Sequence, residues 1–337
     1  MNARRSFSWK ATMWAVAVVL LATAVSIGAL ATRAQQSSPQ TTVSNSQPGT
    51  QWSEAQIRRA VASARVGPKL VPKTWPNGAR VAVSIGFDVD NESPLLNRNN
   101  LEPVALSETE YGATTGLPRI LALLDREGIP ATFFCPAVSL MLAPQLIPAI
   151  QKSGRHEIAV HAWIHESWPE LKDAGEEERL MTQAIDYLTK VTGKRPVGVR
   201  SGGWSFSPYS IDIIRKTGLL YDSSMMGRDE PYHIIANGQD TGILELPVSW
   251  IEDDAPYFGR TGALPSPDLI FRVYQDEFDV AYKEGTLCML TFHPHVSGRR
   301  SRIVHMEKLF NYMKSKPGVW FGTAQQVAEY VKKNTPT

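Results

Sequence analysis

The strongest constraint on the fold is an alternation of short apolar runs with longer amphipathic stretches, which begins near residue 79. Seven runs have the composition of buried strands, at residues 81–87, 131–135, 157–161, 197–200, 219–223, 244–249 and 287–293. Helical spacing of apolar residues lies between most of them, at 117–126, 176–191, 208–216 and 267–283, and glycines follow these stretches as helix C-caps. Strands that alternate with helices predict a mainly parallel α/β sheet. Seven strands in about 250 residues favour a single-domain barrel over an open sheet.

The bulk composition excludes several classes of protein. A hydrophobic fraction of 43% in 337 residues excludes a disordered or collagen-like chain. A formal charge of +2 provides no basic face for nucleic acid, so we expect no nucleic-acid partner. Two cysteines, Cys135 and Cys288, cannot form a disulfide scaffold, and buried free thiols are favoured over a disulfide between them. No glycine-rich phosphate loop follows the first strand, which disfavours nucleotide binding.

The first 34 residues have the pattern of an export signal. Three basic residues, Arg4, Arg5 and Lys10, precede an apolar stretch over 11–31, and small residues follow it. The predicted location is therefore periplasmic or secreted, and the arginine pair also fits a twin-arginine signal. An uncleaved membrane anchor is the alternative, because about 20 apolar residues can span a bilayer. Removing four basic and no acidic residues leaves 31 basic and 33 acidic residues, a formal charge of −2.

We expect a flexible polar linker over residues 35–52, which are rich in Gln, Ser and Thr. Residues 53–337 would then form the catalytic domain.

Polar residues follow the predicted strands, where a parallel barrel carries its chemistry. Asp88 and Asp90 end the first strand two residues apart, so both point to one face, although a solvated pair is the structural alternative. His161 and His165 end the third strand four residues apart, and one helical turn there would bring both imidazoles to one side. A chance pattern is the alternative for the histidine pair alone. Together with Asp90 they supply three metal ligands and leave a position open for water.

Further candidates follow the later strands. Arg200 can hold a carboxylate, and Gly203 lets the backbone approach a ligand closely. Trp204 and Trp250 could stack on a sugar ring, or they could pack in the core. His293 ends the last strand and is the candidate general acid, with a structural histidine as the alternative. His295 ranks second for that role.

These residues resemble five ordered motifs of the NodB-homology polysaccharide deacetylases, the family 4 carbohydrate esterases. The motifs are Asp88/Asp90, His161/His165, 200–204, 250–254 and 291–295, and the resemblance covers about residues 79–323. It implies a distorted (β/α)7 barrel. It also implies that Asp90, His161 and His165 hold a divalent metal, most plausibly Zn²⁺, with Co²⁺, Mn²⁺ or Ni²⁺ as alternatives.

The motifs depart from those of the commonest members. Val89 separates the two acids, Gly202 and Gly203 replace a usual proline, and the last motif reads Phe-His-Pro-His. These departures resemble the branch that contains a peptidoglycan-deacetylase-like protein, allantoinases and cyclic-imide hydrolases, whose members are often oligomeric. Allantoinases of that branch have lost metal ligands, whereas all three remain here.

The resemblance implies a role for each residue. Asp88 would be the base, oriented by Arg200, and His293 would be the acid, held by Asp254 or by Asp253. The expected reaction is hydrolysis of a linear C–N amide, N-deacetylation of a peptidoglycan or chitin-like glycan. A cyclic-amide hydrolase and a non-catalytic glycan-binding protein are the alternatives.

Overall fold

The computed structural model describes residues 49–259 and 264–335, which belong to one compact unit. The predicted export signal and most of the predicted linker lie outside these residues. Among the described helices, none combines the length and the apolar character needed to cross a bilayer.

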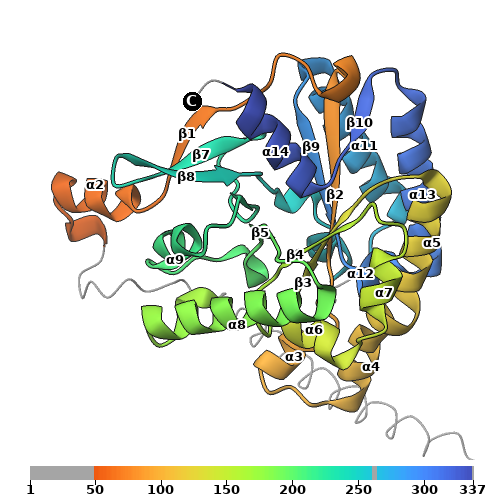
Figure 1. The fold of residues 1–337 in the computed structure, drawn as a ribbon, viewed down its shortest axis with the longest axis horizontal. Helices are drawn as coiled ribbons and strands as arrows, with labels where there is room; N and C mark the ends of the chain where they lie inside the picture. The colour runs from red at the N-terminus through yellow and green to blue at the C-terminus, as the bar shows by residue number, and fades with distance from the viewer. Residues whose placement is uncertain (1–48, 260–263, 336–337) are drawn as a thin grey trace, which may run out of the picture. The chain divides into compact units, whose positions relative to one another are not determined.

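Within the described residues, ten strands form one sheet (Figure 1). The strands are β1 (Arg65–Lys69), β2 (Val81–Asp88), β3 (Thr132–Cys135), β4 (Glu157–Val160), β5 (Gly198–Val199), β6 (Tyr221–Asp222), β7 (Tyr232–Ala236), β8 (Gln239–Glu245), β9 (Leu287–Phe292) and β10 (Val319–Phe321). Their order is β1-β7-β8-β6-β5-β4-β3-β2-β10, and β9 pairs with β2.

Seven of these strands, β2, β3, β4, β5, β6, β8 and β9, overlap the seven predicted runs and are joined by parallel pairings. The predicted parallel α/β fold is therefore confirmed. Between β8 and β9 the connection is one parallel bridge, from Asp253 to Thr291, so no continuous ladder closes the barrel at this seam.

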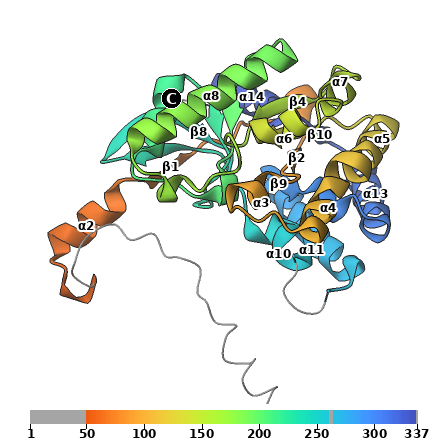
Figure 2. The ribbon, with the colours of Figure 1, turned by 90° about the horizontal axis from the view of Figure 1, so that it is seen from below.

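Helices flank the strands in the predicted alternation. They are α2 (Glu54–Ala62), α3 (Ser93–Asn97), α4 (Pro103–Tyr111), α5 (Leu117–Glu127), α6 (Ala137–Leu142), α7 (Leu146–Gln151), α8 (Ala174–Thr192), α9 (Ser210–Thr217), α10 (Ala255–Phe258), α11 (Pro267–Glu284), α12 (Pro294–Ser297), α13 (Arg300–Ser315) and α14 (Ala324–Asn334). The four predicted helices correspond to α5, α8, α9 and α11, and each ends at a glycine in the left-handed region. Figures 1 and 2 show α5, α13 and α11 side by side on one side of the sheet.

The sequence analysis did not predict three of the strands, β1, β7 and β10. β7 and β8 form an antiparallel hairpin whose turn, Asn237-Gly238, has positive φ at both residues. Asn-Gly is the usual sequence of such a turn, so this signal was present in the sequence. β1 pairs with β7, and four of its five residues are exposed, which removes the apolar pattern of a buried strand.

The buried strand β2 runs through the core and ends at the functional site. All eight of its residues are buried, and Phe87 packs against Phe133 and Phe292 of the two neighbouring strands. The next residues, Asp88 to Asp90, leave this core directly at the carboxyl end of the sheet. The two cysteines are also buried and free, which confirms the thiol prediction.

Candidate active site

The carboxyl ends of β2, β4 and β9 bring the predicted acids and histidines together around Asp90. One oxygen of Asp90 lies 3.4 Å from Nε2 of His161. Its other oxygen lies 3.7 Å from Nε2 of His165 and 3.6 Å from Nε2 of His293. The alternation of side chains along an extended chain explains why Asp88 and Asp90 share a face. Val89 between them is buried in the core, while both acids enter the site.

Asp90, His161 and His165 have the donor set of a metal centre. Their ligand atoms lie within 4.8 Å of one another, and the buried Oδ1 of Asp90 has no hydrogen-bond partner. The Nδ1 atom of His161 lies 2.8 Å from the carbonyl oxygen of Arg200, which leaves Nε2 facing Asp90. A second partner that fixes the ring in this way is typical of metal-binding histidines. The residues present therefore fit a divalent cation.

The helical turn predicted for His161 and His165 is wrong. Residues 161–165 form an irregular loop, in which Ala162 and His165 have φ of 66° and 62°. A left-handed backbone at two points turns the chain sharply enough to return His165 to His161 without a helix. The prediction failed because the spacing of four also fits such a loop.

Glu166 stabilises this loop, and the sequence analysis missed it. Its buried carboxylate accepts hydrogen bonds from the backbone N–H of Trp163 at 3.1 Å and of Ile164 at 2.8 Å. Gly202 also supports the loop, since a Cβ at this position would lie 3.1 Å from the Glu166 carbonyl oxygen. An acid directly after a histidine pair was the only available signal for Glu166.

Asp88 is paired with Arg200, as predicted from the strand ends. The guanidinium Nη1 lies 2.7 Å from Asp88 Oδ1, and both side chains are buried. Arg200 also donates to the carbonyl oxygen and the hydroxyl of Ser223, and it lies 3.9 Å from the centre of the Phe134 ring. Burial alone would raise the pKa of Asp88, but the Arg200 charge, with those of neighbouring histidines, holds it below its usual value. This carboxylate is therefore ionised.

His293 is held by Asp254, which lies closer to it than Asp253. Its Nδ1 lies 2.7 Å from Asp254 Oδ1 and 3.4 Å from Asp253 Oδ1. Asp254 also accepts the backbone N–H of His293 and the hydroxyl of Ser297, a residue that the sequence analysis did not single out. Burial would lower the pKa of His293, yet the two carboxylates raise it well above the ordinary value. His293 is thus protonated and oriented.

His295, the second-ranked acid, has a different environment. Burial and the charge of His293 lower the pKa of His295 to about 4, so it is neutral. Its buried Nδ1 has no hydrogen-bond partner among the described residues. His295 is therefore not in the imidazolium form that a general acid needs near neutral pH.

Two tryptophans form a stacked pair beside Asp88. The rings of Trp204 and Trp250 lie 4.3 Å apart at 20°, and Trp204 Nε1 lies 3.5 Å from Asp88 Oδ2. Gly203, before Trp204, has φ of 64°, a conformation that favours glycine. Trp250 is 46% exposed, so the pair offers an aromatic surface next to Asp88.

Comparisons with known proteins indicate the family of the chain. A polysaccharide deacetylase family model matches residues 99–221. A peptidoglycan deacetylase of Helicobacter pylori is 27% identical over 288 residues, which cover 76% of this chain and 98% of that protein.

Solved structures extend the similarity over most of the chain. A crystal structure described as a polysaccharide deacetylase from Mycobacterium smegmatis has 34% identity and a TM-score of 0.72, with 81% of this chain and 97% of that one covered. A crystal structure of an allantoinase has 28% identity and a TM-score of 0.68, with 78% and 94% covered.

Proposed function

The chain belongs to the polysaccharide deacetylase family, hydrolases of carbon–nitrogen bonds other than peptide bonds, and from this premise we propose a metal-dependent N-deacetylase that acts on an N-acetylated glycan. One observation carries the proposal. Asp90 and two histidines form an unsatisfied donor set that lies between an ionised acid, Asp88, and a protonated histidine, His293. Metal-assisted hydrolysis of an amide needs a base and an acid in these positions.

Asp90, His161 and His165 would hold the metal. Two imidazoles and one carboxylate suit Zn²⁺, and they also accept Co²⁺, Mn²⁺ or Ni²⁺. When bound, such an ion polarises the amide carbonyl and activates water. Asp88 then accepts the proton of the attacking water, since Arg200 keeps this carboxylate ionised and oriented.

His293 completes the reaction at the nitrogen. Its Nε2 faces the site, 3.6 Å from Asp90, while Nδ1 is bound to Asp254. The C–N bond breaks as His293 donates its Nε2 proton to the leaving nitrogen, and the products are acetate and an amine. Asp254 stabilises the imidazolium before transfer. Trp204 and Trp250 would stack on the sugar that carries the amide.

Release of acetate from N-acetylglucosamine oligomers tests this function. We expect release with Zn²⁺ that is lost in Asp88→Ala and His161→Ala. Elemental analysis should find one transition-metal ion per chain in the wild type and none in His161→Ala, with Glu329→Gln, a surface change on α14, as the matched control. Full activity of His161→Ala without bound metal would contradict the mechanism.

A cyclic-amide hydrolase is the second candidate, favoured by the similarity to the allantoinase structure and by the departures in the motifs. Incubation with a cyclic imide separates the two, because ring opening releases no acetate. Ring opening without acetate release from any glycan would replace the first proposal with the second.

We also propose that residues 1–34 direct export to the periplasm or the medium, or anchor the protein if they are retained. Residues 35–52 would be the linker, and a homo-oligomer is consistent with the family branch. N-terminal sequencing of the protein from its own cells tests cleavage, and a start at Met1 would favour the anchor.

A further inference from the structure

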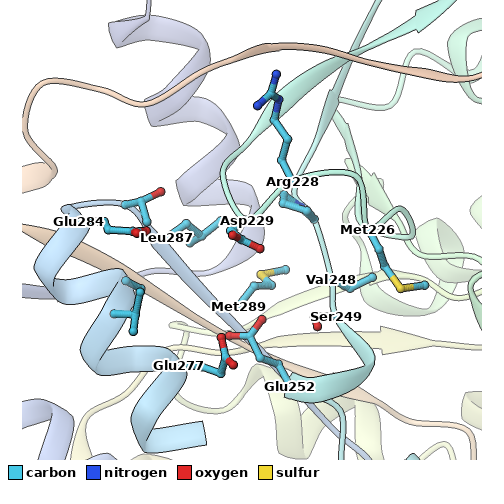
Figure 3. A pocket seen from close by; sticks show the side chains of 14 residues that line it. Met226, Arg228, Asp229, Val248, Ser249, Glu252, Glu277, Glu284, Leu287 and Met289 are labelled. Carbon is cyan, nitrogen blue, oxygen red and sulfur yellow. The ribbon is translucent and has the colours of Figure 1, made fainter. Parts of the chain in front are cut away.

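A second group of acidic side chains lines a pocket of about 90 Å³ outside the proposed active site (Figure 3). The pocket lies at the seam where no continuous ladder joins β8 to β9, and α11 forms one of its walls. Its acids come from three parts of the chain: Asp229 from the segment after β6, Glu252 from the short helix η6 (Trp250–Glu252), and Glu277 and Glu284 from α11.

The acids of this pocket face one another without a basic partner. Figure 3 shows Glu252 and Glu277 side by side, with Asp229 nearby. Among the residues that the structure describes, none of the four acids has an ion pair with a lysine, arginine or histidine. Arg228 is the basic residue of the lining, and its Nε instead donates to the carbonyl oxygen of Gly67. These acids therefore lack a basic counter-ion among the residues that the structure describes.

Burial and mutual repulsion raise the pKa of two of these acids. Burial, followed by the charges of Glu277 and Asp229, raises the pKa of Glu252 to about 8. Burial and the charge of Asp229 also raise the pKa of Glu277. Each carboxylate thus opposes ionisation of the next, as expected of acids that lack a counter-ion.

Thr286 supplies an independent observation at the same place. This residue precedes β9, is only 4% exposed and lines the pocket. Its buried Oγ1 has no hydrogen-bond partner among the described residues. A buried hydroxyl left in this state is unfavourable, and a ligand in the pocket would satisfy it.

We propose that this pocket binds a Ca²⁺-like divalent cation through the carboxylates of Glu252 and Glu277 and the hydroxyl of Thr286. Ca²⁺ prefers oxygen ligands and accepts irregular arrangements of six to eight of them. Two carboxylates and one hydroxyl supply fewer oxygens than this shell needs, so water would complete it. The volume allows this, because it is several times the ~10–15 Å³ that one water molecule needs.

Equilibrium dialysis of the metal-stripped full chain against radioactive Ca²⁺ tests the site. We expect one ion per chain in the wild type, in His161→Ala and in the surface control Glu329→Gln. The double variant Glu252→Gln/Glu277→Gln should bind at least tenfold more weakly. Binding that survives the double substitution would overturn the proposal, as would no binding up to about 1 mM, the weak limit of extracellular calcium modules.

A measurement on the wild type keeps the test independent of the folding of the variants. Because Glu252 is protonated near neutral pH and must ionise to bind Ca²⁺, addition of Ca²⁺ at pH 7 should release a proton. His161→Ala should release it equally. No proton release under conditions of saturation would contradict the assignment of Glu252 as a ligand.

Discussion

Exchange of Asp254 for asparagine tests the proposed acid directly. The carboxylate of Asp254 accepts from His293 at Nδ1, at 2.7 Å, and at the backbone N–H. In Asp254→Asn the charge is lost and one oxygen becomes an NH₂ group that cannot accept the Nδ1 proton. A hydrogen bond to a charged group contributes about 1.5–3 kcal/mol, which corresponds to a fall of about 1–2 units in the pKa of His293.

The lower pKa of His293 should shift the pH profile of the reaction in one direction. His293 must be protonated to act, so the basic limb of the pH profile of kcat/KM should move to lower pH in Asp254→Asn. At the plateau we expect a loss of about 10²–10⁴-fold in kcat, the usual contribution of a general acid. Acetate release from N-acetylglucosamine oligomers, measured between pH 5 and pH 10, reports both the shift of the basic limb and the loss in kcat.

Asp253→Asn is the matched control. Asp253 lies 3.4 Å from Nδ1, beyond a good hydrogen bond, and its Oδ1 accepts the backbone N–H of Ala255, which asparagine can still do. Its effect on kcat should therefore be less than about tenfold. Equal losses in the two variants, or a larger loss in Asp253→Asn, would refute the assignment of Asp254.

Three further predictions concern groups that support the site or the sheet. Glu166→Gln should keep the fold but weaken metal binding by about 10–100-fold, because one carboxylate oxygen that accepts from the loop of the two histidines is replaced by an NH₂ group; a competition titration with a chelator measures this, and unchanged affinity would contradict it. Arg200→Met leaves the buried Asp88 charge unpaired and should lower the free energy of unfolding by about 3–5 kcal/mol in urea, with partial recovery on adding Asp88→Asn; a loss below about 1 kcal/mol would count against the buried pair. Burial lowers the pKa of His156 to about 4 from 6.5, and its Nδ1 accepts the Ala131 N–H, so its neutral form stabilises the fold above pH 6.5. That stability should fall by about 1–2 kcal/mol between pH 6.5 and pH 4, after allowance for partial exposure, and His156→Gln should flatten the slope of unfolding free energy against pH; an identical slope would contradict this.

The sequence was sufficient for the parts of the site that depend on strand periodicity. Asp88 and Asp90 share a face because strand residues alternate, and His293 lies at the end of β9, a fully buried strand. Parallel strands bring such ends to one edge of a sheet, so the meeting of these residues followed from the predicted fold.

The remaining parts depend on loops whose path is set by tertiary contacts. The choice between Asp253 and Asp254 rests on the bridge from Asp253 to Thr291 and on the bond from the Asp254 N–H to the Thr291 carbonyl oxygen. Both place the acid pair along the end of β9, and neither bond is encoded in a local pattern. Glu166 was missed for a similar reason, since its hydrogen-bond donors are backbone N–H groups of an irregular loop.

The proposed roles of the three central acids follow from their partners rather than from their order in the chain. Asp88 has a buried guanidinium, which keeps it ionised and available as a base. Asp254 is bound to His293 and Ser297, so its oxygens are committed to orienting the acid. Asp90 alone retains a buried oxygen without a hydrogen bond, and unpaired buried acceptors are costly unless a cation satisfies them. The same reasoning applies at Thr286, whose buried hydroxyl has no hydrogen-bond partner among the described residues and lies beside acids without a basic counter-ion, and it supports the cation proposed there.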